Sequence, residues 1–260
     1  MPRQAAAEVR GGLLKIHAVT IDFWGTLLHD GPASDDRYRR VRLAEFEKIL
    51  TAAGLAVPRA ALERGYEASA AFLGAVWRTH RDVPVREHVR ALLAGVDPAL
   101  PERVPPPILT ALVEAYARPA LQVPPTVDPG AHGALTALRA RGLTLAVVSN
   151  TMRTPGTTLR KLLAGYRLLE CFAHTTFSDE VGIRKPAPEI FWLTLRALGV
   201  EPETTVHVGD DPVLDVGGAR AAGLRVIQVA SPPPRAPRDG GPDAVIGGLA
   251  ALPDAIEALE

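Results

Sequence analysis

The chain has 260 residues, of which 47% are hydrophobic and 22% are charged, proportions typical of a globular protein. Its 29 basic residues balance its 29 acidic residues, so no net charge favours nucleic acid or an anionic membrane as a partner, and no apolar stretch is long enough to span a bilayer. The single cysteine, Cys171, cannot form an internal disulfide, which predicts a reducing compartment and a cytoplasmic protein.

The first predicted element is a strand over residues 13–22, LLKIHAVTID, whose apolar run ends at Asp22. A turn-like sequence, WGT, follows it. From about Asp35 to Arg118 the pattern becomes helical, because apolar residues recur three or four positions apart and prolines interrupt them at intervals. The sequence therefore predicts an all-helical segment directly after the first strand.

Beyond Pro124 and Pro125 helices alternate with strands. Predicted helices end at Gly142, Gly199 and Gly223, where a left-handed cap is favourable, and the apolar runs LAVVS, TTVHV and RVIQV follow them. Strands that are apolar on both faces indicate a parallel sheet covered by helices on each side. The sequence predicts a doubly wound α/β, Rossmann-like parallel-sheet core over residues 13–30 and 125–260, with an all-helical cap domain inserted over residues 31–124.

Polar residues follow three of the predicted strands at the point where each strand ends. They are Asp22, the pair Ser149-Asn150, and the pair Asp210-Asp211. In an open parallel sheet the carboxyl ends of the strands share one edge, and ligands bind beyond that edge. The sequence therefore predicts one site assembled from these three strand ends.

Asp22 is a candidate nucleophile, because a carboxylate can attack phosphorus and form an aspartyl-phosphate. Gly25 and Thr26 supply a tight turn, backbone amides and a hydroxyl that suit an anion held against this carboxylate. Ser149 and Asn150 are typical either of a helix N-cap or of donors to the oxygens of a transferring group. Both interpretations of this pair stay open at this point.

Lys185 stands beside two prolines in the segment GIRKPAPEIF, and the chain has only four lysines against 25 arginines. Its compact ammonium suits neutralising both Asp22 and a substrate phosphate. Asp210, Asp211 and Asp215 repel one another unless they are solvated, protonated or bound to a cation, and oxygen ligands beside a phosphate favour Mg²⁺. We expect Asp210 to bind the metal, Asp211 to cap a helix, and Asp215 to orient Lys185 or the metal's waters.

In chain order, the segments DFWGTL at Asp22, SNT at Ser149, KPAPEIF at Lys185 and GDDPVLD at Asp210 resemble the four motifs of the haloacid dehalogenase-like superfamily. The resemblance covers nearly the whole chain, and the helical segment lies where the family's first cap type is inserted. The resemblance implies a hydrolase, most often a phosphatase that uses Mg²⁺ and acts on a small phosphorylated molecule.

The resemblance also implies roles for individual residues. Asp22 is the implied nucleophile and first metal ligand, with the main-chain carbonyl of Trp24 and the carboxylate of Asp210 as further ligands. Thr26, Ser149 and Lys185 are the implied phosphoryl-binding residues.

Trp24 departs from the family pattern. Phosphatases of the family usually have a second aspartate at this position, two residues after the nucleophile, as general acid and base. An indole N–H donates a hydrogen bond but cannot shuttle a proton, and losing a positioned acid–base group costs about 10²–10⁴ in rate. His29 and Asp30, just past the turn, are the nearest candidates for a substitute.

Two alternatives to a phosphatase follow from Trp24. The 2-haloacid dehalogenases of the superfamily also lack the second aspartate, usually have an aromatic residue there and need no metal. They replace the acidic fourth motif, whereas this chain keeps Asp210 and Asp215. The other alternative is a pseudoenzyme that binds a phosphorylated ligand with little turnover.

The cap carries no clear code for a substrate, and the oligomeric state is not readable from the sequence. The basic run at the start of the first cap helix has the composition of an anion site, but a solvated helix face is the favoured interpretation. The run consists of Arg37, Arg39, Arg40 and Arg42.

Overall fold

The computed structural model describes residues 15–31, 34–230 and 240–260. The predicted beginning of the first strand, residues 13–14, and the first residues of the predicted cap, 32–33, lie outside the described residues. Residues 231–239 of the predicted core lie outside them as well. The domain limits at 13, 30/31 and 124/125 therefore stay predictions.

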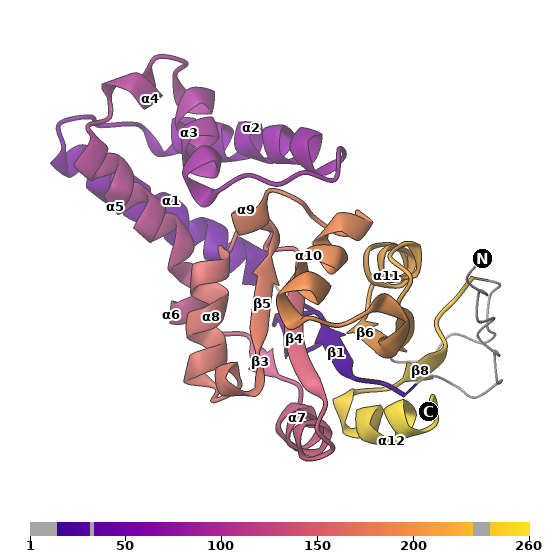
Figure 1. Cartoon of the computed structure of the whole chain (residues 1–260). Coiled ribbons are helices and arrows are strands. Elements are labelled where there is room, and N and C mark those ends of the chain that lie inside the picture. Colours follow the sequence, from indigo (N-terminus) through magenta and orange to yellow (C-terminus); the bar gives the residue numbers. More distant parts are fainter. Residues whose placement is uncertain (1–14, 32–33, 231–239) are drawn as a thin grey trace, which may run out of the picture.

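A parallel sheet of six strands forms the centre of the molecule, in the order β5-β4-β1-β6-β7-β8 (Figure 1). The chain leaves the central strand β1 toward β4 and β5, then returns to the other side of β1 for the remaining strands. The predicted doubly wound, Rossmann-like parallel sheet is therefore confirmed. The strands are β1 (Ala18–Ile21), β4 (Thr144–Ser149), β5 (His174–Phe177), β6 (Thr205–Gly209), β7 (Arg225–Val229) and β8 (Ala244–Ile246).

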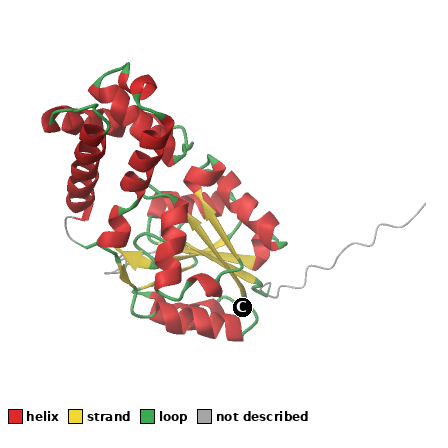
Figure 2. Ribbon diagram, turned by 90° about the vertical axis from the view of Figure 1, so that its left-hand side faces the viewer, coloured by secondary structure: helices red, strands yellow, loops and turns green. Residues whose placement is uncertain are grey.

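Helices cover both faces of this sheet (Figure 2). Leu135, Leu159 and Ile256 pack into one large cluster with the strands, whereas Phe191 and Ala219 pack into a smaller cluster on the other side. Burial on both faces explains why the central strands are apolar throughout. The helices of the first cluster are α7 (Ala131–Ala140), α8 (Gly156–Gly165) and α12 (Leu252–Glu257), and those of the second are α10 (Pro188–Leu198) and α11 (Gly218–Ala221).

The segment between β1 and β4 is helical and has a hydrophobic core of its own, in which Phe46, Leu92 and Tyr116 are fully buried. Figure 1 shows these helices projecting from one end of the sheet. The short strands β2 (Leu28–His29) and β3 (Thr126–Val127) lie just before and just after the inserted helices. They pair antiparallel and so hold the two ends of the insertion together. The inserted helices are α1 (Ser34–Ala52), α2 (Arg59–Trp77), α3 (Val85–Val96), α4 (Leu100–Arg103), α5 (Pro106–Ala117) and α6 (Pro119–Gln122).

The register of the three central strands brings their carboxyl ends level. Ile21 of β1 pairs with Val147 of β4 and with Val208 of β6. The residues that follow these strands therefore emerge side by side at one edge of the sheet, as the sequence predicts. Within the described residues, no helix has both the length and the apolar character that crossing a membrane requires.

Candidate active site

Asp22 is the first residue after β1 and is buried. Its backbone N–H donates to the carbonyl of Val208 at 2.9 Å, so the backbone still follows β6 at this point. Three residues later Gly25 has a φ of 76°, and a Cβ at Gly25 would lie 2.5 Å from Oδ2 of Asp210. Glycine at this position therefore allows both the turn and the approach of the Asp210 carboxylate.

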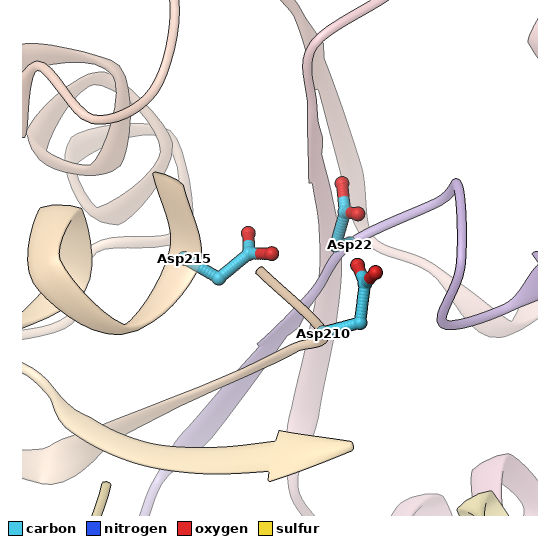
Figure 3. A group of neighbouring side chains, drawn as sticks. All are labelled: Asp22, Asp210 and Asp215. Carbon is cyan, nitrogen blue, oxygen red and sulfur yellow. The ribbon is translucent and has the colours of Figure 1, made fainter. Parts of the chain in front are cut away.

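Three carboxylates meet at this edge (Figure 3). One oxygen from each of Asp22, Asp210 and Asp215 lies within 4.8 Å of the others. Asp210 follows β6, and Asp215 lies in a π-helical segment, η3 (Pro212–Gly217). The structure thus brings together three of the acidic residues that the sequence singled out, from two separate motifs.

Lys185 lies among these carboxylates and is itself buried. Its Nζ donates to Oδ1 of Asp22 at 2.5 Å and to Oδ1 of Asp215 at 2.6 Å. Asn150 holds the lysine's main chain from both sides, since its Nδ2 donates to the Lys185 carbonyl at 3.1 Å and its Oδ1 accepts from the Lys185 N–H at 2.9 Å. The observed contact of Asn150 is therefore with Lys185, and its predicted contact with substrate stays a prediction.

Burial and the Lys185 ammonium set the pKa values of the carboxyl groups in this cluster. Burial, opposed by Lys185 and aided by the nearby Asp215 carboxylate, raises the pKa of Asp22 to about 7. For Asp215, burial also acts upward, but Lys185 and the hydrogen bond from His207 outweigh it and hold its pKa below the ordinary value. Burial disfavours the Lys185 ammonium, but Asp215 and Asp22 raise the pKa of Lys185 above its ordinary value.

A buried histidine that the sequence reasoning missed completes the chain of contacts. His207, on β6, lies with Nε2 3.0 Å from Oδ1 of Asp215 and with Nδ1 2.9 Å from Oγ1 of Thr20. Burial lowers the pKa of His207, which favours the neutral ring, and in a neutral ring that donates from Nε2 to Asp215 the Nδ1 atom accepts from Thr20. A polar residue inside the apolar run TTVHV is the signal that marks it in the sequence.

The side chain of Asp211 accepts hydrogen bonds from backbone groups and contacts none of the other carboxylates among the described residues. Its Oδ1 accepts from the N–H groups of Val213 and Leu214, both at 2.8 Å, and Pro212 is the first residue of the segment that it caps. This is the arrangement expected of an N-cap aspartate followed by proline. Asp211 is thus placed as a cap, beside the metal-ligand candidates.

The predicted phosphoryl-binding residues lie close in sequence to the strand ends. Thr26 is fully buried, and its Oγ1 has no hydrogen-bond partner among the described residues. Ser149 is also fully buried, with its Oγ donating weakly to the Asn150 carbonyl at 3.3 Å. A buried hydroxyl without a partner carries a free-energy cost, so Thr26 indicates a ligand oxygen that accepts from it.

The donor set fits a divalent cation. Asp22, Asp210 and Asp215 offer three carboxyl groups, and within the described residues Lys185 is the only ammonium that contacts any of them, through Asp22 and Asp215, so acidic groups outnumber the cation in a largely buried cluster. Oxygen-only ligands select hard cations, and a site of this kind beside a phosphate suits Mg²⁺. The residues present therefore fit a hard divalent cation such as Mg²⁺.

The Trp24 side chain and its two proposed substitutes have different surroundings. The Nε1 of Trp24 is buried without a hydrogen-bond partner in the described residues, and the ring packs edge-on against Phe23. Asp30 lines the same cavity as Trp24, and partial burial raises the pKa of Asp30 above its ordinary value. His29 instead lies on β2, 3.6 Å from the carboxylate of Asp128. Of the two, Asp30 is therefore the better-placed candidate for proton transfer.

Sequence comparison finds relatives among phosphatases and haloacid dehalogenase-like hydrolases. The phosphoserine phosphatase of Thermus thermophilus is 37% identical over 165 residues, which cover 64% of this chain and 59% of that protein. Human haloacid dehalogenase-like hydrolase domain-containing protein 3 is 36% identical over 171 residues, which cover 65% of this chain and 64% of that protein. The chain thus spans about three fifths of the length of these curated relatives.

Solved structures share the fold. The crystal structure of a 2-haloacid dehalogenase from Pseudomonas syringae pv. Tomato DC3000 aligns with a TM-score of 0.70 at 24% identity, covering 94% of this chain and 100% of that one. The family model described as a haloacid dehalogenase-like hydrolase matches residues 16–223. This chain is a member of the haloacid dehalogenase-like hydrolase family.

Proposed function

We propose that this chain is a Mg²⁺-dependent phosphatase that hydrolyses a small phosphate ester through an aspartyl-phosphate on Asp22. The observation that carries the proposal is the buried contact between Lys185 and Asp22 beside the Asp210 and Asp215 carboxylates. A nucleophilic carboxylate, a fixed ammonium and a hard-cation donor set are what transfer of a phosphoryl group to a protein needs.

In this mechanism the Asp22 carboxylate attacks phosphorus, so an oxygen–phosphorus bond to Asp22 forms as the bond to the leaving oxygen breaks. Water then attacks the same phosphorus, which releases inorganic phosphate and regenerates Asp22. Lys185 neutralises Asp22 and the oxygens of the transferring group, and the Thr26 and Ser149 hydroxyls donate to those oxygens. A Mg²⁺ held by Asp22, Asp210 and the Trp24 carbonyl supplies additional neutralising charge.

The orientation of Lys185 is supported by neighbouring protein residues. Asn150 fixes its main chain, and Asp215 binds its ammonium. Asp215 is held in turn by His207 and by the backbone N–H of Asp211 at 3.0 Å. Each partner limits the motion of a long side chain, which is how a lysine becomes a fixed charge.

Phosphate release tests the proposal. We expect release from p-nitrophenyl phosphate and from one or more sugar, nucleotide or acid phosphates in Mg²⁺, and loss of release in excess EDTA. Release that EDTA leaves unchanged would contradict the role of the metal, and absence of release from every ester would contradict the phosphatase.

The second candidate is a 2-haloacid dehalogenase, which Trp24 favours because these enzymes lack the second aspartate. The carboxylate cluster argues against it, since Asp210 and Asp215 add uncompensated negative charge to a site that needs no cation. Chloride release from 2-chloropropionate that EDTA does not affect would favour the dehalogenase. Binding of a phosphorylated ligand without any product would favour the pseudoenzyme.

A further inference from the structure

A cavity of about 380 Å³ lies between the helical insertion and the edge of the sheet. It is lined by the turn after β1, by residues of α1 and α2, and by the loop after β4. Trp24, two residues beyond Asp22, lines it, and so does Arg153, which follows Ser149 and Asn150 by a few residues. The volume is at the small end of the range for small-molecule sites, so a compact group attached to a phosphate fits here.

The Arg153 guanidinium is oriented from one side only. Its Nη1 donates to Oγ of Ser69 at 3.2 Å and to the hydroxyl of Tyr116 at 2.5 Å, and its Cζ lies 4.2 Å from the ring centre of Tyr66. A guanidinium has five N–H donors, and in the described part of the chain Nε and Nη2 have no protein acceptor. Neither atom is among the buried polar atoms that lack a partner. Arg153 therefore presents a fixed cation with a free, accessible side.

Arg42 is a second cation in the cavity wall, next to Arg153. It is 2% exposed, and it donates to the Tyr116 carbonyl at 2.9 Å, the Tyr66 hydroxyl at 3.1 Å and the Arg153 carbonyl at 3.0 Å. All three acceptors are uncharged. The sequence favoured a solvated helix face for this arginine, and its burial corrects that interpretation.

Neither guanidinium group has an acidic partner in the part of the chain that the structure describes. Within residues 15–31, 34–230 and 240–260, neither Arg42 nor Arg153 forms an ion pair, whereas Arg39 on the same helix pairs with Glu67 at 3.0 Å. Buried charges in proteins are normally paired, because an unpaired one is costly. Two unpaired cations beside a cavity indicate that the missing charge belongs to a ligand.

The negative residues of the cavity limit how far an anionic ligand extends. Asp35 and Asp36 are in the first turn of α1, and Arg42 follows Asp35 by seven residues, or about 10 Å along the helix. The cavity is therefore acidic toward one end and basic toward the other. A small carboxylate suits the basic end, whereas a polyanion long enough to reach both ends is repelled.

We propose that the substrate is a phosphate ester whose leaving group carries a carboxylate, and that Arg153, backed by Arg42, binds this carboxylate. The proposal rests on the proposed phosphatase function, because it places the phosphoryl group at Asp22 and the rest of the substrate in the adjoining cavity. The free side of the guanidinium allows two parallel N–H···O bonds to the carboxylate, which gives both charge and direction.

The test compares two phosphate esters of similar size, 2-phosphoglycolate and 2-hydroxyethyl phosphate, in which a neutral hydroxyl replaces the carboxylate of the leaving group. We expect wild-type kcat/KM to favour 2-phosphoglycolate at least tenfold, and Arg153→Met to lower that preference by about 10- to 100-fold, mainly through KM. Arg153→Lys keeps the positive charge but loses the two parallel N–H donors of the guanidinium, so we expect a preference for 2-phosphoglycolate between those of wild type and Arg153→Met. Arg90→Met is the matched control, because Arg90 pairs with Glu102 on the surface of the insertion, and it leaves the preference unchanged.

Equal hydrolysis of the two esters by the wild type, or an equal loss for both in Arg153→Met, overturns the proposal. Phosphate release from p-nitrophenyl phosphate in the same assays reports separately on the proposed function. Titration calorimetry of 2-phosphoglycolate in Mg²⁺ covers the case of no turnover. If no ester is hydrolysed, 2-phosphoglycolate binding that Arg153→Met weakens tenfold or more supports the carboxylate site, and unchanged 2-phosphoglycolate binding contradicts it.

Discussion

Asp82 of the helical insertion and Arg184 of the core form a buried ion pair, with Nη1 of the arginine 3.1 Å from Oδ2 of the aspartate. The same carboxylate accepts from Oγ of Ser178 at 2.5 Å and from Nε1 of Trp77 at 3.0 Å. Arg184 directly precedes Lys185. The insertion is therefore fastened to the loop that carries the ammonium of the active site.

Removal of Asp82 tests this link. Asp82→Ala leaves the Arg184 guanidinium buried without its acidic partner, and we expect the free energy of unfolding to fall by about 3–5 kcal/mol. We also expect kcat to fall, because the loop before Lys185 loses its support. Urea unfolding and initial rates measure the two effects. Arg103→Met breaks an exposed pair with Asp97 and serves as the control, with a change within about 0.5 kcal/mol; an equally small change in Asp82→Ala would contradict the link.

His88 gives the insertion a defined pH dependence. It is fully buried in the core of the insertion, and burial lowers its pKa from 6.5 to about 4. The unfolded chain therefore binds a proton that the folded chain rejects between these values, so stability is lost as the pH falls through this window. We expect a loss of about 2 kcal/mol between pH 7 and pH 5 from this residue.

The measurement for His88 is urea unfolding of the wild type and of His88→Gln at both pH values. His88→Gln removes the titrating ring, so the difference between pH 7 and pH 5 shrinks by that amount. An unchanged difference in the variant would mean that other groups cause the acid sensitivity.

The fold was predictable where the chain follows simple patterns. The apolar runs in β4, β6 and β7, each preceded by a helix that ends at glycine, were sufficient for the parallel sheet. The first strand was predicted from Leu13, but among the described residues, which start at 15, β1 begins only at Ala18. β5 and β8 were not predicted, because HTTF and AVI are too short or too polar to show a strand pattern, and their pairing with β4 and β7 decides their structure.

Asp210 belongs to the carboxylate cluster, whereas the side chain of its neighbour Asp211 caps η3. Substituting each in turn therefore separates loss of a metal ligand from loss of a helix cap. Asp210→Asn removes a charge from the carboxylate cluster, so we expect the Mg²⁺ concentration for half-maximal activity to rise at least tenfold. Asp211→Ala removes a helix cap, so we expect a stability loss of about 1 kcal/mol and a Mg²⁺ requirement within twofold of wild type. Titration of activity with Mg²⁺ distinguishes the two, and an equal shift in both variants contradicts the assignment of Asp210.

Trp24 predicts a burst of product with p-nitrophenyl phosphate. The p-nitrophenolate leaving group needs no proton, whereas hydrolysis of the aspartyl-phosphate lacks the usual base, so the second step limits turnover. Stopped-flow absorbance should show one equivalent of p-nitrophenol per enzyme before a slower steady state. Trp24→Asp should reduce the burst and raise the steady-state rate about tenfold or more, while Trp24→Phe keeps the burst. Linear release by the wild type would indicate that Asp30 or another group acts as the base.

The candidate site was predictable in its main residues and not in its supporting ones. Asp22 and Asp210 directly follow strands, where topology alone brings them together, and Lys185 stands in a short motif beside two prolines. His207 and Arg42 were missed or misjudged because each has a contact with a residue far away in sequence, His207 with Thr20 and Arg42 with the Arg153 carbonyl. A histidine within a strand and an arginine on a helix have no pattern of their own until the tertiary contacts are known.

The most direct test of the account is the covalent intermediate itself. Enzyme quenched in acid during turnover of p-nitrophenyl phosphate in Mg²⁺ should give a peptide containing Asp22 that is heavier by one phosphoryl group and loses it in hydroxylamine. Asp22→Asn should give neither the modified peptide nor phosphate release. Steady phosphate release by Asp22→Asn, or a phosphoryl group found on another residue, would contradict the role of Asp22 as nucleophile.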